Sequence, residues 1–95
     1  MHSFTEENYL KAIYKLQETN GEVVATSVLA QVMGVHAPSV TDMLKRIAGK
    51  KLVTYQKSKG VKLTERGRQV AVAIIRNHRL WEVFLVDKLG FKWDE

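Results

Sequence analysis

Hydrophobic residues recur every three or four positions in four segments of this 95-residue chain, and this spacing predicts four amphipathic helices. The first helix should begin at Thr5 as its cap, with Phe4 packed on Tyr9 as a hydrophobic staple. The pair Asn20-Gly21 should end it. The positions that we expect to face inward are Tyr9, Leu10, Ile13 and Leu16, with Tyr14 at the edge of that face.

The segment from Thr26 to Gly49 predicts two short helices joined by a tight turn. Gly34 supplies the left-handed residue that ends the first helix, and Val35 should then turn inward. The second helix should begin near His36, and Pro38 is tolerated there because the first helical turn does not need its N–H. Two compact helices joined by a glycine-containing turn form a helix-turn-helix, whose second helix fits a major groove. The expected inward positions are Val28, Leu29, Val32 and Met33 in the first helix, and Val40, Leu44 and Ile47 in the second.

A short β-prone region follows the helix-turn-helix. Residues Leu52 to Tyr55 and Val61 to Leu63 are separated by the five residues Gln56 to Gly60, which predicts a hairpin. Packed against the helices, this ribbon would be the wing of a winged helix-turn-helix and would place Lys57 and Lys59 beside a sugar-phosphate backbone. The alternative is an exposed hairpin whose lysines keep its edge from pairing with other strands.

The last predicted helix begins after Thr64 as its cap and continues to Leu89, which is long for a chain of this size. It carries more apolar surface than three short helices can cover, and the excess predicts a dimer interface or a contact with a further helix. Gly90 should end it, and we expect the natural chain to continue beyond Glu95. The apolar positions concerned are Val70, Ala71, Ile74, Ile75, His78, Leu80 or Trp81, Leu85 and Leu89. The predicted fold class is therefore mainly α with a small β-hairpin, a winged helix-turn-helix followed by a long helix.

The distribution of charge indicates a partner for this fold. The net charge is +5, and between His36 and Arg79 there are eleven Lys or Arg residues against only Asp42 and Glu65. A localised positive field attracts a polyanion, and its coincidence with a helix-turn-helix favours nucleic acid. The alternative is a solvated basic face that only aids solubility.

Other features exclude several classes of protein. The longest apolar run, Val70 to Ile75, is far shorter than the roughly 20 residues that cross a bilayer, and the N-terminus has no secretion-like apolar block. With no cysteine in addition, we expect a cytoplasmic protein without a membrane partner. The chain has no glycine-rich phosphate loop, no nucleophile elbow and no cysteine cluster, so we do not expect an enzyme.

Two histidines could have specific roles. His78 and Glu82 are four residues apart and therefore lie on one helical face, where imidazole and carboxylate together suit a divalent transition metal. The alternative for this pair is a surface hydrogen bond. His36 lies in the first turn of the second helix of the helix-turn-helix, where a helix cap or a base contact is the expected role.

Four blocks of the sequence resemble one known family. The segments TEENYLKAIYKL, APSVTDMLKRI, GVKLTERGR and NHRLWEVFLVDKLGFKWDE are similar to the N-terminal part of metal-dependent repressors of the diphtheria toxin repressor and manganese transport regulator family. The resemblance extends from Thr5 to Glu95. It implies a homodimer that binds Fe(II) or Mn(II) and then binds a palindromic operator in double-stranded DNA, repressing metal-uptake genes. It also implies a DNA-binding domain at residues 1–63 and, at residues 64–95, the start of a dimerisation and metal-binding region that is incomplete at the C-terminus.

For the metal, the resemblance implies Asn8, His78 and Glu82 as ligands, with the remaining ligands on a helix beyond Glu95. Family members commonly have Met or Asp at the position of Asn8, and manganese-type members have Glu at the position of Lys11. An amide oxygen is a weaker, neutral ligand, and a lysine ammonium repels a cation. These two differences disfavour a manganese-type binuclear site that involves the first helix.

For DNA, the predicted recognition helix is at about residues 36–49 and the wing at about residues 52–63. We expect Asp42 to pair with Lys45 or Arg46, and the alternative is a hydrogen bond from a cytosine amino group. Two alternative functions stay open, a winged-helix regulator that does not sense metal and a winged helix used for protein–protein contact. The predicted DNA-binding residues are Thr26, Ser27, His36, Ala37, Pro38, Ser39, Thr41, Asp42, Lys45, Arg46, Lys57 and Lys59.

Overall fold

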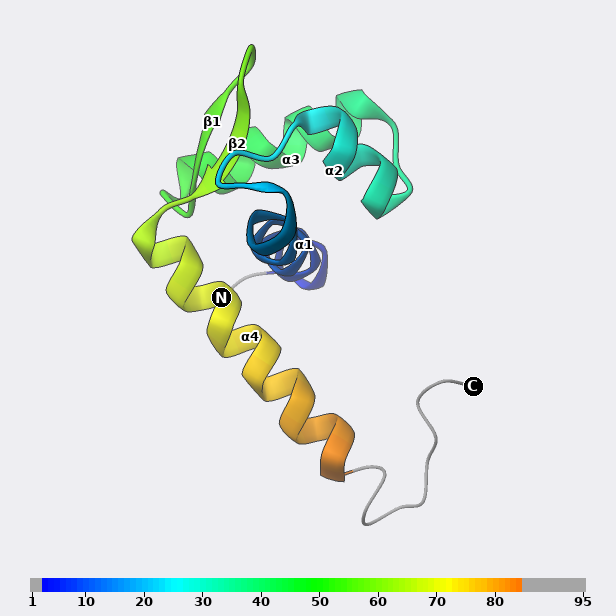
Figure 1. The fold of residues 1–95 in the computed structure, drawn as a ribbon, viewed down its shortest axis with the longest axis vertical. Helices are drawn as coiled ribbons and strands as arrows, with labels where there is room; N and C mark the ends of the chain where they lie inside the picture. The colour runs from blue at the N-terminus through cyan, green and yellow to red at the C-terminus, as the bar shows by residue number, and fades with distance from the viewer. Residues whose placement is uncertain (1–2, 85–95) are drawn as a thin grey trace.

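The computed structural model describes the backbone of residues 3–84 and the side chains of residues 3–77, and this part of the chain folds into four helices and a two-stranded antiparallel sheet (Figure 1). The order of elements confirms the predicted fold class, a winged helix-turn-helix followed by a long helix. The elements are α1 (Phe4–Asn20), α2 (Thr26–Met33), α3 (Ala37–Gly49), β1 (Val53–Gln56), β2 (Gly60–Leu63) and α4 (Glu65–Phe84).

Helix α1 begins after Ser3 rather than at Thr5, so the predicted cap was wrong. The Ser3 hydroxyl accepts a hydrogen bond from the Glu6 N–H at 3.1 Å, and the Ser3 N–H donates to Glu6 Oε1 at 2.9 Å. This reciprocal capping box satisfies two polar groups at once, whereas a lone hydroxyl satisfies one. Phe4 is 72% exposed, so the predicted staple with Tyr9 does not form. The predicted end of the helix is confirmed, since Gly21 follows it with a φ of +110°.

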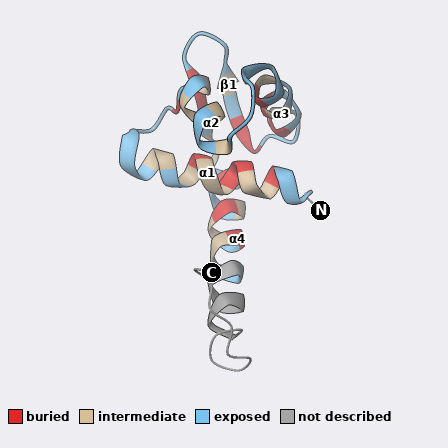
Figure 2. Ribbon diagram, turned by 90° about the vertical axis from the view of Figure 1, so that its right-hand side faces the viewer, coloured by how far each residue is buried: buried red, intermediate tan, exposed pale blue. Residues whose placement is uncertain are grey.

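The hydrophobic core lies between α1, the helix-turn-helix and the base of the sheet (Figure 2). Most predicted inward positions of α1 and α3 are confirmed as buried. Two predicted inward positions outside these helices are not buried: Val32 in α2 and Val35 in the turn after it, with 55% and 39% of their surface exposed. Because α2 has only eight residues, Leu29 is its one fully buried side chain and Val32 is left facing solvent. The buried hydrophobic residues are Tyr9, Leu10, Ile13, Val24, Leu29, Val40, Leu44, Ile47, Leu52, Val53, Val61, Ala71 and Ile74.

Helix α4 runs from the base of the sheet across α1 and away from the winged helix (Figure 1). Thr64 caps it as predicted, accepting a hydrogen bond from the Gly67 N–H at 3.0 Å and donating one to the Lys51 carbonyl at 2.8 Å. Ala71 and Ile74 are buried against the core, and Val70 and Ile75 are half-buried. The remaining apolar positions predicted for an interface, from His78 to Leu89, lie outside the described side chains. No helix in the described part of the chain combines the length and hydropathy that crossing a bilayer requires.

Candidate nucleic-acid interface

The turn between α2 and α3 fixes the start of the predicted recognition helix. Gly34 has the left-handed conformation that was predicted, with φ +70° and ψ 32°, and its N–H is directed at the last carbonyls of α2. The Val35 N–H donates to the Ala30 carbonyl at 3.1 Å, which closes the turn through the backbone. Since these bonds hold the turn, Val35 need not be buried, and its predicted inward orientation was wrong.

Helix α3 has one buried side and one exposed side, as its sequence pattern predicted. Val40, Leu44 and Ile47 are fully buried at spacings of four and three. The opposite side carries polar and cationic groups, and the fully buried stripe keeps that side turned to solvent. The exposed residues of this side are Ser39, Asp42, Lys45 and Arg46, with Thr41 half-buried at its edge.

The first turn of α3 is also open. His36 is the N-terminal flanking residue of α3, but its side chain makes no capping hydrogen bond, so the predicted capping role was wrong. The His36 carbonyl instead accepts from the Ser39 N–H at 3.0 Å. His36, Ala37 and Pro38 are all exposed at the N-terminal end of α3.

The start of α2 offers a second set of polar groups. Thr26 is half-buried and Ser27 is exposed, and the preceding Ala25 provides no side-chain cap. The first intrahelical bond is the one that the Leu29 N–H donates to the Ala25 carbonyl at 3.1 Å. The N–H groups before it have no intrahelical acceptor, and such a helix start binds anions readily.

The wing is shorter at its tip than predicted. Gln56 and Gly60 are paired within the sheet, so the connection is the three residues 57–59 rather than five. Gly60 allows this because it adopts a φ of +121°, and because a Cβ there would overlap the Val24 carbonyl oxygen. Val24 and Val61 exchange backbone hydrogen bonds of 2.8 and 2.9 Å, which hold β2 to the segment before α2. The wing is therefore fixed to the helix-turn-helix by backbone bonds, with Lys57 and Lys59 exposed at its tip.

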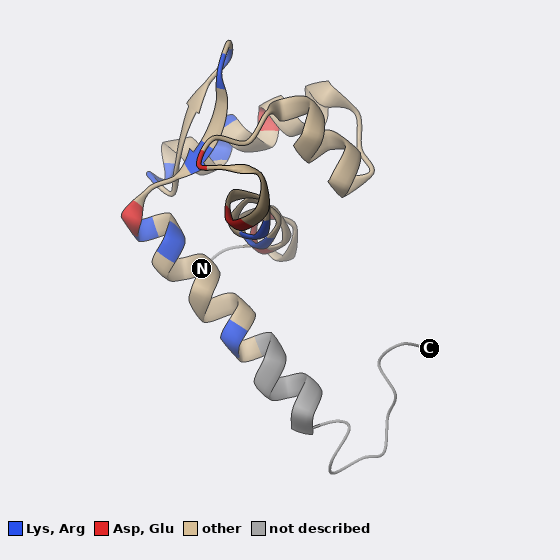
Figure 3. Ribbon diagram, viewed as in Figure 1, with Lys and Arg blue, Asp and Glu red and all other residues tan. Residues whose placement is uncertain are grey.

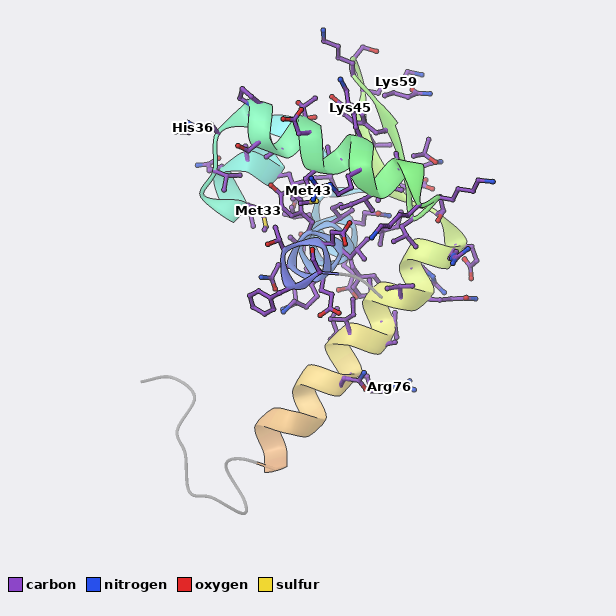
Figure 4. All side chains as sticks on the ribbon, turned by 180° about the vertical axis from the view of Figure 1, so that it is seen from behind. Met33, His36, Met43, Lys45, Lys59 and Arg76 are labelled. Atoms are coloured by element: carbon purple, nitrogen blue, oxygen red, sulfur yellow. The ribbon has the colours of Figure 1, made fainter. Side chains whose placement is uncertain are left out.

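The cationic groups of this face do not take part in the ion pairs that the described residues form. Among the described residues, the ion pairs within 4 Å are Lys50–Glu6, Lys62–Glu22 and Arg68–Glu65. None of the four predicted DNA-binding cations takes part, and the predicted pairing of Asp42 with Lys45 or Arg46 does not form. Figure 3 shows Lys and Arg on the wing and on α3, and Figure 4 shows Lys45 and Lys59 at one end of the molecule with Arg76 far from them on α4. The predicted DNA-binding cations, none of which has an ion pair with another described residue, are Lys45, Arg46, Lys57 and Lys59.

One ion pair of this region was not predicted. Glu6, in the first turn of α1, is 3% exposed, and its Oε1 accepts a hydrogen bond from Lys50 Nζ at 2.9 Å. The hydrogen bond from Lys50 is the main cause that holds the pKa of the Glu6 carboxyl below its ordinary value, and the Ser3 N–H adds to it. The spacing Ser3-x-x-Glu6 is a sequence signature of the capping box, but it carries no signal for Lys50, 44 residues away.

The predicted metal ligands can be located only in part. Asn8 is half-buried on α1, which packs against α4. His78 and Glu82 lie on α4, but their side chains are outside the described residues. The side chains described for residues 3–77 contain no group of three or more His, Cys, Asp or Glu that could hold a metal ion. By themselves they do not make a metal site, and the ligand set stays a prediction.

Two family models match the chain. Residues 1–61 match the N-terminal DNA-binding domain of iron-dependent repressors. Residues 64–95 match the metal-binding and dimerisation domain of iron-dependent repressors. The two matches meet at the junction between the wing and α4.

Several known proteins are similar to this chain over most of its length. The iron-dependent repressor IdeR of Mycobacterium tuberculosis is 35% identical over 91 residues, which are 96% of this chain and 39% of that protein. The HTH-type transcriptional regulator MntR of Oceanobacillus iheyensis is 33% identical over 83% of this chain and 53% of its own length. A solved manganese-dependent transcriptional repressor in complex with manganese superposes with a TM-score of 0.80, at 40% identity, over 95% of this chain and 41% of that one. The chain thus spans well under half the length of IdeR.

Proposed function

Because the chain belongs to the iron-dependent repressor family, we propose that it is the DNA-binding part of a metal-dependent transcriptional repressor. The family resemblance predicted from the sequence blocks is confirmed by both family matches. The observation that carries the proposal is the exposed face of α3. This face is polar and cationic opposite a fully buried apolar stripe, and the wing lysines beside it have no ion pair within the described residues.

The proposed mode of binding places α3 in the major groove of double-stranded DNA. The exposed first turn, His36 to Ser39, would meet base edges, where hydroxyls donate or accept and the apolar groups of Ala37 and Pro38 contact thymine methyls. Thr41, Lys45 and Arg46 lie further along the helix, where hydroxyl and cationic groups suit phosphates.

The wing and α2 would add contacts to the backbone of the DNA. Lys57 and Lys59 project from a hairpin that is held by the Val24–Val61 bonds, so their position relative to α3 is set before binding. Thr26 and Ser27 begin α2, where free N–H groups suit a phosphate. Phosphate contacts of this kind fix the register of a protein on the duplex but carry no sequence information.

We further propose that the protein is a cytoplasmic homodimer on a palindromic operator, with the DNA-binding domain ending near residue 63 and a dimerisation and metal-binding region from residue 64. The match of residues 64–95 to a metal-binding and dimerisation domain supports this division. A two-fold dimer would present two copies of α3 about one DNA turn apart, which a palindrome matches. That the protein is not an enzyme stays a prediction.

Fe(II) or Mn(II) is the metal that we propose as the regulator, supported by the iron-dependent and manganese-dependent relatives. Asn8, His78 and Glu82 would be among its ligands, and a bound metal would supply a link between α1 and α4. Helices α1 and α4 already pack against each other in the described part of the chain. A neutral amide at Asn8 makes this link weaker than one through a carboxylate.

The DNA-binding proposal is tested with duplexes that the chain itself selects from a random-sequence pool. Fluorescence anisotropy then gives the Kd for the selected duplex over a series of salt concentrations. We expect log K to fall linearly with log salt, and we expect the slope to become shallower by about 0.9 for each phosphate interaction that Lys45→Ala or Arg46→Ala removes. A slope near zero for the wild-type chain would refute DNA binding and favour a protein–protein module.

The metal proposal has a separate test. Binding to the same duplex is measured with Mn(II), with Fe(II) under anaerobic conditions, and with a chelator, for the wild-type chain and for His78→Ala. We expect metal to strengthen binding by the wild-type chain and to affect the variant less. Equal affinity in metal and in chelator would refute metal dependence of this chain and leave its DNA binding intact.

A further inference from the structure

The unpredicted ion pair between Glu6 and Lys50 joins two elements that are far apart in the sequence. Glu6 lies in the first turn of α1, and Lys50 directly follows the last residue of α3. Lys50 Nζ is 2.9 Å from Glu6 Oε1, the same oxygen that accepts the Ser3 N–H. Glu6 is the only charged side chain of the described part of the chain that is buried.

Burial makes this contact sensitive to small displacements. A carboxylate removed from water needs a cationic or hydrogen-bonding partner, and losing that partner is costly. The second oxygen, Oε2, is buried and has no hydrogen-bond partner among the side chains of residues 3–77 or the backbone of residues 3–84. Within residues 3–77, Lys50 is therefore the one cation that compensates the Glu6 charge, and no second ion pair would replace it if the end of α3 moved away.

The buried stripe of α3 sets which side of the helix faces the core, and the ion pair adds a contact at the C-terminal end of the helix. Helix α3 packs mainly against α2 and β1, whereas α1 packs mainly against α4 and β2. Met43 of α3 is half-buried against the core, and Figure 4 draws it on the side of α3 nearer to α1. A methionine side chain adapts to small shifts of its neighbours. The ion pair therefore joins the C-terminal end of α3 to the start of α1, two elements that have few apolar contacts with each other.

We propose that Glu6 is a positioning residue for DNA recognition, which holds Lys50 and thereby sets the angle at which α3 presents Ser39, Lys45 and Arg46 to the major groove. This inference rests on the proposed DNA-binding function. In this arrangement Lys50 is engaged with Glu6 and does not bind a phosphate. Glu6 acts on specific binding through geometry, without touching the DNA.

The experiment compares two duplexes, one selected by the wild-type chain from a random pool and one scrambled duplex of the same composition. The variants are Glu6→Gln, Lys50→Met, the double variant and Lys50→Arg, with Kd measured by anisotropy over a series of KCl concentrations. Gln at position 6 can still complete the capping box with Ser3, so α1 keeps its start. Glu18→Gln is the matched control, because it makes the same charge change at an exposed position of α1.

We expect Glu6→Gln and Lys50→Met each to weaken binding to the selected duplex by roughly tenfold, a typical effect of one coupled interaction. Binding to the scrambled duplex and the salt slope should not change, since every phosphate interaction is retained. The double variant should be no weaker than the weaker single variant, because both remove one interaction. Lys50→Arg should restore most of the affinity, and Glu18→Gln should behave as wild type.

Two results would overturn the proposal while leaving DNA binding in place. One is unchanged affinity in Glu6→Gln. The other is a salt slope that is shallower by about 0.9 in Lys50→Met with equal weakening on both duplexes, which would show that Lys50 binds a phosphate. If circular dichroism shows that Glu6→Gln is misfolded, the comparison of Lys50→Met with Lys50→Arg decides, and equal affinities overturn the proposal. A wild-type chain that binds neither duplex would instead refute the proposed function, and this inference with it.

Discussion

Replacing Gly67 with alanine should destabilise this protein, although the same change stabilises most helices. Gly67 is buried in the first turn of α4, where the chain leaves the wing. A Cβ at this position would overlap the Leu52 carbonyl oxygen and lie 2.8 Å from the carbonyl carbon, against an ordinary carbon–carbon contact of about 3.5 Å or more. The two backbone segments would have to separate by about 0.7 Å or more to relieve that contact.

Leu52 cannot move away freely. Its side chain is buried, its N–H donates to the Ile47 carbonyl, and its carbonyl accepts the Thr64 N–H at 3.0 Å. Overpacking costs about 1–3 kcal/mol and a broken backbone hydrogen bond about 1 kcal/mol, while alanine regains about 1 kcal/mol of helix propensity. The net expectation is a decrease of about 1–3 kcal/mol in the free energy of unfolding.

The assay is urea denaturation followed by far-ultraviolet circular dichroism, with Gly49→Ala as the matched control. Gly49 is exposed at the end of α3, and a Cβ there would have no atom within 4 Å. We expect Gly49→Ala to match the wild type or to gain up to about 1 kcal/mol, as an unhindered helical glycine does. If Gly67→Ala unfolds at the same urea concentration as the wild type, or at a higher one, the close approach of α4 to Leu52 is refuted.

Three further predictions concern charge. Lys57→Gln and Lys59→Gln should each make the salt slope of DNA affinity shallower by about 0.9, and Arg76→Gln should leave the slope unchanged. If only Arg76→Gln made the slope shallower, the DNA interface would lie on α4 and not on the wing. Asp42→Asn should strengthen binding to a scrambled duplex by about two- to fivefold, the size of one exposed ion-pair interaction, and weaker binding would instead indicate that Asp42 accepts a hydrogen bond from a base. The lowered pKa of Glu6 means that its contribution to stability is present above the ordinary Glu pKa and is lost as the pH falls through the folded-state pKa. Urea midpoints measured from about pH 7 to about pH 3 should therefore fall more steeply for the wild type than for Glu6→Gln, and parallel curves would rule out this contribution.

Helix periodicity predicted the parts of the fold that depend on local sequence. The stripe Val40, Leu44 and Ile47 is buried as expected, because a period of 3.6 residues leaves it only one side of α3 to occupy. Gly34 and Thr64 end and begin helices as expected, since their conformational or hydrogen-bonding preferences act within a few residues. These local signals were sufficient to predict the exposed face of α3 and the presence of the wing.

Several of the errors arose where a residue's role depends on a distant segment, whereas the wrong caps at Thr5 and His36 were local. The wing loop is three residues rather than five because Gly60 is held next to Val24, a contact that hydrophobic spacing does not reveal. Glu6 was overlooked because its partner Lys50 follows a different helix. Val32 fits an apolar pattern, but α2 is too short to bury it, and Val35 lies in the turn after α2, which backbone hydrogen bonds hold. For the metal, the sequence predicts Asn8, His78 and Glu82 by resemblance, and the described side chains do not test that set.

The most direct test of the central claim is an NMR titration of the isotopically labelled chain with its selected duplex. We expect the largest amide chemical-shift changes at residues 36–46 and 57–59, with smaller ones at Thr26 and Ser27 and none at Arg76. These are the positions where the exposed side of α3, the wing tip and the start of α2 would contact DNA. Shift changes confined to α4, or spread evenly over the chain, would contradict recognition of DNA by α3 and the wing.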